Sequence, residues 1–472
     1  MVNLLQRRRN QRVLVIGLDC ASPKLVFDQF QDSLPNLTRL RNTGTWGRLR
    51  SSIPCITVPA WASMLSSRDP GVMGVYGFRN RVNYSYDALQ LADSTAVRVK
   101  RIWDYLGDAG KQSVIVGVPQ TYPVRPLNGH LISDFMTPNT DATFTFPALL
   151  KQEVLKQTPD YRFDVREFRT PDKDDLLHSI LEMTARQMQV VKQLIRTKPW
   201  DFFMYMNIGV DRMHHGFWRY HDPEHRFHVP NSPYANVIFD YYRQMDSFIG
   251  ELITLAGDDT TVVVVSDHGV TRMDGGICIN EWLWHNGWLT FKSPPPEGQL
   301  TRFEDCDVDW SKTKAWASGG YYGRIFLNVR GREPQGTIAP ENYETVRELL
   351  RAAIAAIPDA DGQPMNTQVF KPQAIYQQVN GIAPDLLTYF GDLHWRAVGS
   401  LGHGRHYTFE NDTGPDDANH AEHGIFIIND PHQRGIGQVE GHQLMDIAPT
   451  LLEMFRLPIP SAMQGTAIRR TS

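Results

Sequence analysis

The sequence predicts an α/β protein with a central, mostly parallel sheet, helices on both faces of that sheet, and a smaller inserted subdomain. Two observations predict the sheet: short apolar runs alternate with longer segments of helical periodicity, and several of these runs end abruptly at Asp or His. A third observation predicts the insertion. From about residue 271 to residue 402 the alternation loosens, and Pro-rich and Trp-rich pieces appear.

Five apolar runs are typical of buried core strands, because each is short and is bounded by polar or turn-forming residues. Since helical segments separate most of them at short spacing, we expect the sheet to be mostly parallel. In chain order the predicted strands are Arg12–Asp19, Ser113–Pro119, Asp201–Gly209, Val262–Ser266 and Gly424–Asp430.

Seven segments have apolar residues at helical spacing. A glycine, Gly44, ends the first of them, and Pro59 lies in the first turn of the second, where proline is favoured. In chain order the predicted helices are Pro35–Gly44, Thr57–Ser66, Val97–Gly110, Asp175–Lys198, Tyr234–Gly257, Asn342–Ile357 and Met445–Pro460.

The chain has 472 residues, which is too long for one domain of average size. We expect a catalytic core formed by residues 12–270 and 403–472, and an inserted subdomain of residues 271–402 that shapes the substrate site. Residues 1–11 include three consecutive arginines and are expected to be a flexible basic N-terminus.

Composition excludes several classes of function. The net charge of −4 gives no overall attraction to nucleic acid or to an anionic membrane. No segment approaches the roughly 20 apolar residues of a membrane span. The four cysteines form no CxxC pair, which disfavours a cysteine-based zinc site and suits a reducing compartment. We therefore expect a cytoplasmic protein with no evident nucleic-acid or membrane partner, while its oligomeric state stays open.

Ionisable residues follow three of the predicted strands. Asp19 ends the first strand, Asp211 follows the strand Asp201–Gly209, and Asp267–His268 follow the run of valines. Parallel sheets bind ligands at the carboxyl ends of their strands, so these side chains should meet at one edge. Taken singly, each has another interpretation: Asp19 as a helix cap, and the Asp–His pair as part of an exposed loop.

Further candidates lie near these strand ends. Asp211 and His215 are four residues apart, share a helical face and could bind Zn²⁺ or Mn²⁺, although a surface pair fits the spacing too. Thr57 lies just before a predicted helix, where it could be a nucleophile or merely the N-cap. His420 and His423 precede the last strand, and either could be a ligand.

These residues lie in motifs whose order resembles the alkaline phosphatase superfamily. The resemblance is closest to its type I phosphodiesterase/nucleotide pyrophosphatase-like branch, as in predicted bacterial phosphohydrolase/phosphomutase proteins, and it extends from Val13 to Gly465. The motifs are VLVIGLD, IPCITVPAWASML, VDRMHHG, VVVVSDHG, NHAEHGIFI, LNVRGREPQG, APDLL and MDIAPTLLEMFRLPIPSAMQG.

The resemblance implies an alkaline-phosphatase-like sandwich and two divalent metal ions, with zinc expected and manganese as the alternative. It implies that one metal is held by Asp19, Thr57, Asp267 and His268. The other is implied to be held by Asp211, His215 and His420. We choose His420 over His423 because the last histidine of the family usually precedes a glycine by four residues, as His420 precedes Gly424.

The sequence departs from the family at one contact. Nucleotide pyrophosphatases carry an Asn that contacts a phosphate oxygen, and the simplest alignment places Phe78 there. Arg79, Asn80 or Arg81 could make this contact, and we name Arg79 and Asn80 as tentative substrate ligands. Sulfatases of the superfamily carry Cys/Ser-x-Pro-x-Arg, and the sequence TVPAW at Thr57 lacks both the Cys/Ser and the Arg.

The resemblance implies a two-metal phosphohydrolase that cleaves a phosphodiester or pyrophosphate bond of a small phosphate ester or nucleotide, through a phospho-threonine intermediate on Thr57. The alternative is a phosphomutase or phosphomonoesterase, for which Arg79, Arg81, Arg324 and Arg332 could grip a dianionic phosphate. A non-catalytic binding protein of the same fold is a third hypothesis, which would not need a nucleophile beside a metal. The natural substrate and the metal stay undetermined.

Overall fold

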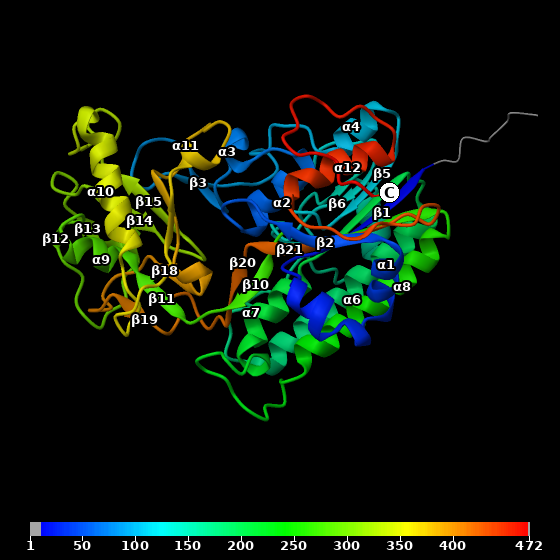
Figure 1. Ribbon diagram of the computed structural model, residues 1–472, viewed down its shortest axis with the longest axis horizontal. Helices are drawn as coiled ribbons and strands as arrows, with labels where there is room; N and C mark the ends of the chain where they lie inside the picture. Colours follow the sequence, from blue (N-terminus) through cyan, green and yellow to red (C-terminus); the bar gives the residue numbers. More distant parts are fainter. Residues whose placement is uncertain (1–10, 471–472) are drawn as a thin grey trace, which may run out of the picture.

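The structure is a computed structural model that describes residues 11–470. A flexible basic N-terminus was expected over residues 1–11, and all of these except Gln11 lie outside the described residues. Two lobes are visible in Figure 1, a larger one built on a ten-stranded sheet and a smaller one built from separate small sheets.

The large sheet runs in the order β22-β2-β21-β9-β1-β8-β5-β6-β7, with β23 also pairing with β2. Strands β9, β1, β8, β5 and β6 pair in parallel, whereas β21 is antiparallel to both β2 and β9. The prediction of a mostly parallel sheet is therefore confirmed. The strands of this sheet are β1 Arg12–Leu18, β2 Thr45–Arg50, β5 Ser113–Val116, β6 Gly129–Ile132, β7 Thr145–Phe146, β8 Phe202–Asn207, β9 Thr260–Val265, β21 His423–Asn429, β22 Gly437–Gln438 and β23 His442–Gln443.

Helices cover both faces of this sheet (Figure 1). On one side lie α1 Pro35–Thr43, α6 Lys173–Thr197, α7 Gly209–His221 and α8 Val237–Ala256. On the other side lie α2 Thr57–Ser66, α4 Ile102–Asp108 and α12 Ile447–Met454. Strands β1 and β9 are apolar after their first one or two residues, as suits strands shielded by helices on both faces, and their side chains Leu14, Ile16 and Val264 are fully buried.

The smaller lobe has a separate hydrophobic core. Its four-stranded sheet, β14-β15-β17-β16, packs beside α10, and β18-β11-β19 and β12-β13 form two further small sheets (Figure 1). The elements are β11 Gly275–Cys278, α9 Ile279–His285, β12 Phe291–Ser293, β13 Asp307–Val308, β14 Ala315–Ser318, β15 Gly323–Leu327, α10 Tyr343–Ala355, β16 Gln368–Phe370, α11 Pro372–Ile375, β17 Leu386–Tyr389, β18 Trp395–Val398 and β19 Tyr407–Thr408.

Segments outside residues 271–402 also contact the smaller lobe. Arg81 forms an ion pair with Glu333 at 3.2 Å, and the ring of Tyr86 stacks on Trp310 at 3.6 Å. Both Arg81 and Tyr86 come from the hairpin of β3 (Arg79–Arg81) and β4 (Leu89–Leu91), which precedes most of the large sheet in the chain. The domain boundaries 12–270, 271–402 and 403–472 thus remain a prediction. The sequence pattern did not indicate that this hairpin contacts the smaller lobe.

The remaining elements connect the lobes or cap the large sheet. They are α3 Pro70–Met73, β3 Arg79–Arg81, β4 Leu89–Leu91, α5 Leu150–Gln157, β10 Gly269–Arg272 and β20 Ala418–Ala421. Short 3-10 or π segments lie at Lys24–Gln29, Gln31–Ser33, Phe303–Asp305, Pro340–Asn342, Gly391–Leu393 and Leu444–Asp446. Among the described residues, no helix is both long enough and apolar enough to span a bilayer.

Two predicted helices are shorter in the structure. The helix expected from Val97 begins at Ile102, because the Asp104 carboxylate accepts the backbone N–H of Arg101 at 2.8 Å and fixes the helix start there. The helix expected to reach Pro460 ends at Met454, and Arg456 then has a left-handed backbone with φ of 56°. Local capping, which periodicity does not report, decides both ends.

Candidate metal centre

Three neighbouring strands bring the predicted acidic residues together. Strand β1 lies between β8 and β9 and pairs in parallel with both, so the carboxyl ends of all three meet at one edge. Asp19 follows β1, Asp211 lies in the first turn of α7 after β8, and Asp267 follows β9. The edge that the sequence indicated therefore exists, and all three carboxylates are buried there.

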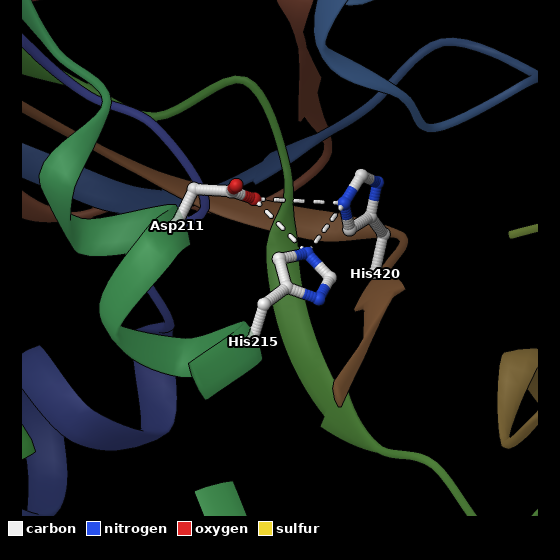
Figure 2. A group of neighbouring side chains, drawn as sticks. All are labelled: Asp211, His215 and His420. Atoms are coloured by element: carbon white, nitrogen blue, oxygen red, sulfur yellow. Dashed lines mark hydrogen bonds and ion pairs between the residues drawn. The ribbon is translucent and has the colours of Figure 1, made fainter. Parts of the chain in front are cut away.

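Asp211, His215 and His420 form one compact group (Figure 2). His215 Nε2 lies 3.2 Å from Asp211 Oδ1 and 3.3 Å from His420 Nε2, and His420 Nε2 lies 3.6 Å from the same carboxylate oxygen. Helix α7 supplies the first two residues, one turn apart, and β20 supplies His420. One carboxylate oxygen and two imidazole nitrogens thus face a common point.

Hydrogen bonds at the Nδ1 atoms orient the imidazoles of His215 and His420. His420 Nδ1 donates to the Cys55 carbonyl at 3.0 Å, and His215 Nδ1 lies 2.7 Å from Asp416 Oδ1. With Nδ1 of each ring used in this way, Nε2 of each ring offers its lone pair to a cation. Burial lowers the pKa of His215, but Asp416 and Asp211 outweigh burial and raise it to about 9, so a bound cation would displace a proton.

Asp19, Thr57, Asp267 and His268 form the adjoining group. Thr57 Oγ1 lies 3.4 Å from both Asp19 Oδ1 and His268 Nε2. His268 Nε2 lies 3.1 Å from Asp267 Oδ2 and 3.6 Å from Asp19 Oδ1. His268 Nδ1 donates to the Gly269 carbonyl at 3.1 Å, so its Nε2 also presents a lone pair.

Unsatisfied carboxylate oxygens show that the donor set fits divalent cations. Asp211 Oδ1 and Asp267 Oδ2 are buried without a hydrogen-bond partner, which is costly for a charged group. Burial and a neighbouring carboxylate raise the pKa of Asp19 and of Asp267 well above the usual value. Cations between these groups would satisfy the oxygens and cancel the repulsion, and carboxylate and imidazole donors suit Zn²⁺ and Mn²⁺.

Thr57 is the first residue of α2, and Ile56 occupies the N-cap position without a side-chain capping bond. The interpretation of Thr57 as merely an N-cap is therefore wrong, because its hydroxyl contacts the site instead of a backbone N–H. The start of α2 sets the helix N-terminus, with its partial positive charge, beside this hydroxyl. Such a position favours an anion, whether an alkoxide or a phosphate oxygen.

Two supporting residues were not predicted. Trp61 Nε1 donates to Asp19 Oδ2 at 2.7 Å, and Asp416 orients His215 as described above. Trp61 lies four residues after Thr57 in α2, so the i,i+4 rule could have placed both side chains on the site-facing side of the helix. For Asp416 the sequence offers no such signal, because its contact with His215 spans 201 residues of the chain.

The alternative ligand His423 and the neighbouring His214, which was not a candidate, lie apart from this cluster. His423 begins β21, is only partly buried and pairs with Arg50 across the sheet. His214 lies 3.3 Å from the Tyr242 hydroxyl. The structure therefore brings His420, and neither His423 nor His214, beside Asp211.

Arg79 and Asn80 differ in their positions. Arg79 lines a cavity of about 580 Å³ that is also lined by Thr57, Asp211 and His420. Asn80 Oδ1 accepts the Tyr76 N–H at 2.7 Å, and its Nδ2 donates to the Gly77 carbonyl at 3.0 Å, so this side chain closes a turn. Phe78 lines the cavity. A substrate contact by Asn80 remains a prediction.

Comparison with known proteins places this chain in a family. The family model for type I phosphodiesterase/nucleotide pyrophosphatase matches residues 13–416. Two solved structures of murine ectonucleotide pyrophosphatase/phosphodiesterase 5, one of them an inactive variant in complex with AMP, are 15% identical. Their TM-scores are 0.53 for the AMP complex and 0.52 for the other, with 95% of this chain and 96% of theirs covered.

The human ectonucleotide pyrophosphatase/phosphodiesterase 5 is 14% identical with a TM-score of 0.49, covering 98% of this chain and 97% of its own. No curated protein matches the sequence. The murine likeness shows the fold, while the family match extends over most of the chain. The chain is therefore a hydrolase of the type I phosphodiesterase/nucleotide pyrophosphatase family, within the alkaline phosphatase superfamily.

Proposed function

We propose that this enzyme cleaves a phosphodiester or pyrophosphate bond with Thr57 as its nucleophile and two divalent metal ions as cofactors. One observation carries the proposal: Thr57 Oγ1 lies 3.4 Å from both Asp19 and His268, beside the second group of Asp211, His215 and His420. A hydroxyl so close to two potential metal ligands can be activated without a separate histidine base.

Each metal would have its own set of ligands. Asp19, Thr57, Asp267 and His268 would hold one, and Asp211, His215 and His420 would hold the other. Two such cations stabilise negative charge on the attacking and leaving oxygens of an in-line displacement and lower the pKa of water. Zinc is our first choice and manganese the second, because the donor atoms suit both.

The reaction would consist of two displacements at phosphorus. Thr57 Oγ1 loses its proton and attacks the phosphorus, the P–O bond to the leaving group breaks, and the leaving oxygen takes up a proton. A phospho-threonine that retains the other ester group forms. Water then attacks the same phosphorus, the bond to Thr57 Oγ1 breaks, and the threonine hydroxyl takes up a proton. The products are an alcohol, or a phosphate when a pyrophosphate bond is cleaved, and a phosphate monoester.

Ion pairs in the smaller lobe bear on the choice between diester and monoester. Arg81 pairs with Glu333 at 3.2 Å, and Arg332 pairs with Asp385 at 2.8 Å, so two of the four arginines considered for gripping a dianionic phosphate are engaged elsewhere. This supports the diesterase over the phosphomutase or monoesterase. The small-molecule substrate would enter the cavity between the lobes, which residues of both lobes line.

The test is turnover of bis-p-nitrophenyl phosphate and p-nitrophenyl phosphate by protein freed of metal and then loaded with zinc or manganese. We expect faster cleavage of the diester, and a loss of at least about a thousandfold in Thr57→Ala. Ser66→Ala is the matched control, because this hydroxyl on the same helix donates to the Ala62 carbonyl, away from the site.

Three outcomes would count against the proposal in different ways. Faster monoester cleavage would favour the monoesterase. Full activity of Thr57→Ala would exclude Thr57 as nucleophile. Cleavage of neither ester by metal-loaded protein, together with unchanged stability and ligand binding in Thr57→Ala, would favour a binding protein.

A further inference from the structure

The cavity beside Thr57 is lined by more basic than acidic side chains. Three acidic residues line it: Asp211, Glu304 and Asp412. Six arginines line it: Arg79, Arg169, Arg212, Arg302, Arg324 and Arg396. A cavity of this composition concentrates anions, and one ester phosphate carries only a single negative charge.

Carboxylates already engage three of these arginines. Arg212 pairs with Asp164 at 2.7 Å and with Asp211 at 2.6 Å. Arg169 pairs with Asp416 at 2.8 Å, and the exposed Arg302 pairs with Asp305 at 2.9 Å. These three arginines form hydrogen-bonded ion pairs, so the arginines without a hydrogen bond to a carboxylate are the other three.

Arg396 is the most unusual of the remaining arginines. Its side chain is only 5% exposed, and its Nε and Nη1 are buried without a hydrogen-bond partner. It forms long ion pairs with Asp412 at 3.9 Å and with Asp416 at 4.0 Å, and both distances exceed that of a hydrogen bond. Asp412 and Asp416 offset part of its charge, but burying guanidinium N–H groups without hydrogen bonds is costly, which points to an acceptor that arrives with the ligand.

The position of Arg396 relates it to the metal centre. It lies on β18 of the smaller lobe, in the wall shared with a second cavity of about 370 Å³. Its guanidinium lies 5.7 Å from the ring centre of Tyr321, and that ring lies 4.9 Å from the ring of His215. A group bound at Arg396 would therefore be near the reacting phosphorus without being the group that reacts.

Arg79 and Arg324 form a second basic part of the cavity, but they are satisfied in other ways. Arg324 donates to the Arg79 carbonyl, and Arg79 is exposed to solvent. Solvent can hydrate an exposed guanidinium at little cost, so these two residues give no comparable reason to expect a bound anion. Arg396 is therefore the residue that identifies the position of the subsite.

We propose that Arg396 binds a second anionic group of the substrate, a phosphate or a carboxylate, distinct from the ester phosphate that Thr57 attacks. The inference deepens the proposed function and rests on it for the location of the reacting phosphate. It narrows the substrate to phosphate esters that carry a further negative charge on the portion that reaches the smaller lobe. A planar guanidinium can donate two parallel hydrogen bonds, a bidentate geometry that suits both phosphate and carboxylate.

Three matched p-nitrophenyl phosphodiesters test this subsite: the propyl ester, the 2-carboxyethyl ester and the 2-(phosphonooxy)ethyl ester. The first has no second anion, the second adds a carboxylate and the third adds a phosphate. Their dissociation constants are measured by calorimetry on zinc-loaded Thr57→Ala protein, in which cleavage should not interfere. We expect at least one anionic ester to bind about tenfold or more tightly than the propyl ester.

The same measurements on Arg396→Gln, combined with Thr57→Ala, assign the preference to this residue. We expect the anionic preference to fall to within about twofold, while the affinity for the propyl ester changes less than threefold. Arg396→Lys should keep part of the preference, because it retains the charge. Arg243→Gln is the control for net charge, since Arg243 is an exposed residue on α8 that pairs with Asp240.

Thermal unfolding separates ligand binding from a structural role of Arg396. Because the guanidinium is buried without hydrogen bonds, Arg396→Gln should melt at the same or a higher temperature than the parent protein. A clear fall in melting temperature would show that Arg396 stabilises the fold and would overturn the inference. Equal binding of the three esters, or no measurable binding of any, would overturn it too.

Turnover measurements test the proposed function separately from the binding measurements that test the subsite. Turnover of the propyl ester by the protein with Thr57 intact tests phosphodiester hydrolysis without a second anion. If that ester is cleaved while all three bind equally, the subsite fails and the proposed function stands. If none is cleaved but the anionic preference depends on Arg396, the subsite stands and the proposed reaction fails.

Discussion

The imidazole rings of His268 and His420 stack with their centres 3.8 Å apart and an angle of 18° between their planes. One ring follows β9 and the other lies on β20, so this contact joins the two groups of candidate ligands. Burial lowers the pKa of both histidines, and the neighbouring His420 lowers the pKa of His268 further. Two neutral, stacked imidazoles are suited to bind cations, whereas two protonated ones would repel each other.

Asp416 should act as a positioning residue for the metal ligand His215. Because its carboxylate fixes Nδ1 of that ring at 2.7 Å, Asp416→Asn should weaken zinc binding by about 10- to 100-fold. Competition with a chromogenic chelator measures this affinity. The neighbouring Asp417→Asn is the control, since Asp417 pairs with Arg219 at 2.6 Å; an equal loss in both variants would argue against a specific role of Asp416.

Asp267 should destabilise the folded protein in the absence of metal. Its Oδ2 is buried without a hydrogen-bond partner, and nearby carboxylates repel it. Asp267→Asn should therefore raise the free energy of unfolding of metal-free protein at neutral pH by about 1–3 kcal/mol, while activity with metal is lost. Urea unfolding with and without zinc checks this, and a less stable metal-free variant would contradict it.

The hydrogen bond from Trp61 should matter for activity more than for folding. Trp61→Phe keeps most of the buried ring but removes the donor that holds Asp19 Oδ2 at 2.7 Å. We expect a loss on the order of tenfold in kcat/KM, and weaker metal binding. Trp103→Phe, another buried tryptophan on a helix away from the site, should leave both quantities near the parent values.

Asp134 should give the stability a defined pH dependence. Burial raises its pKa to about 7, although the backbone N–H groups of Thr121 and Met136 act in the opposite direction. Since this folded value lies above the usual 3.8, Asp134 contributes stability that is present below pH 3.8 and lost as pH rises through about 7. In Asp134→Asn the side chain does not titrate, so this loss of stability with rising pH should be absent.

Urea unfolding at pH 5 and pH 7 measures that difference. Between pH 5 and pH 7, the free energy of unfolding of the variant should rise by about 2 kcal/mol relative to that of the parent protein. Comparing one protein with itself at two pH values removes any constant cost of replacing a carboxylate oxygen by an amide nitrogen. Parallel pH dependences of the two proteins would show that Asp134 does not titrate in this range.

Much of the fold could be predicted because the apolar runs are short and clearly bounded. The strands that precede Asp19, Asp211 and Asp267 are all present, and their parallel pairing accounts for the common edge. Helix ends were less predictable, since the start of α4 depends on the Asp104 side chain and not on periodicity. The β3–β4 hairpin joins the smaller lobe through contacts made far along the chain.

The supporting residues of the site were harder to predict for a different reason. Asp416 and Arg396 are ordinary polar residues in the sequence, and their importance arises from burial and from partners that tertiary contacts supply. The candidate ligands, by contrast, carry local signals: a polar residue at a strand end, or an i,i+4 spacing. Sequence patterns can therefore indicate ligands more readily than the residues that orient them.

The stereochemical course at phosphorus tests the central claim most directly. One diastereomer of a phosphorothioate diester is hydrolysed in ¹⁸O-labelled water by metal-loaded protein, and the configuration of the monoester product is determined. Two in-line displacements, first by Thr57 and then by water, predict net retention of configuration. Net inversion would show that water attacks the substrate directly, and would contradict a phospho-threonine intermediate.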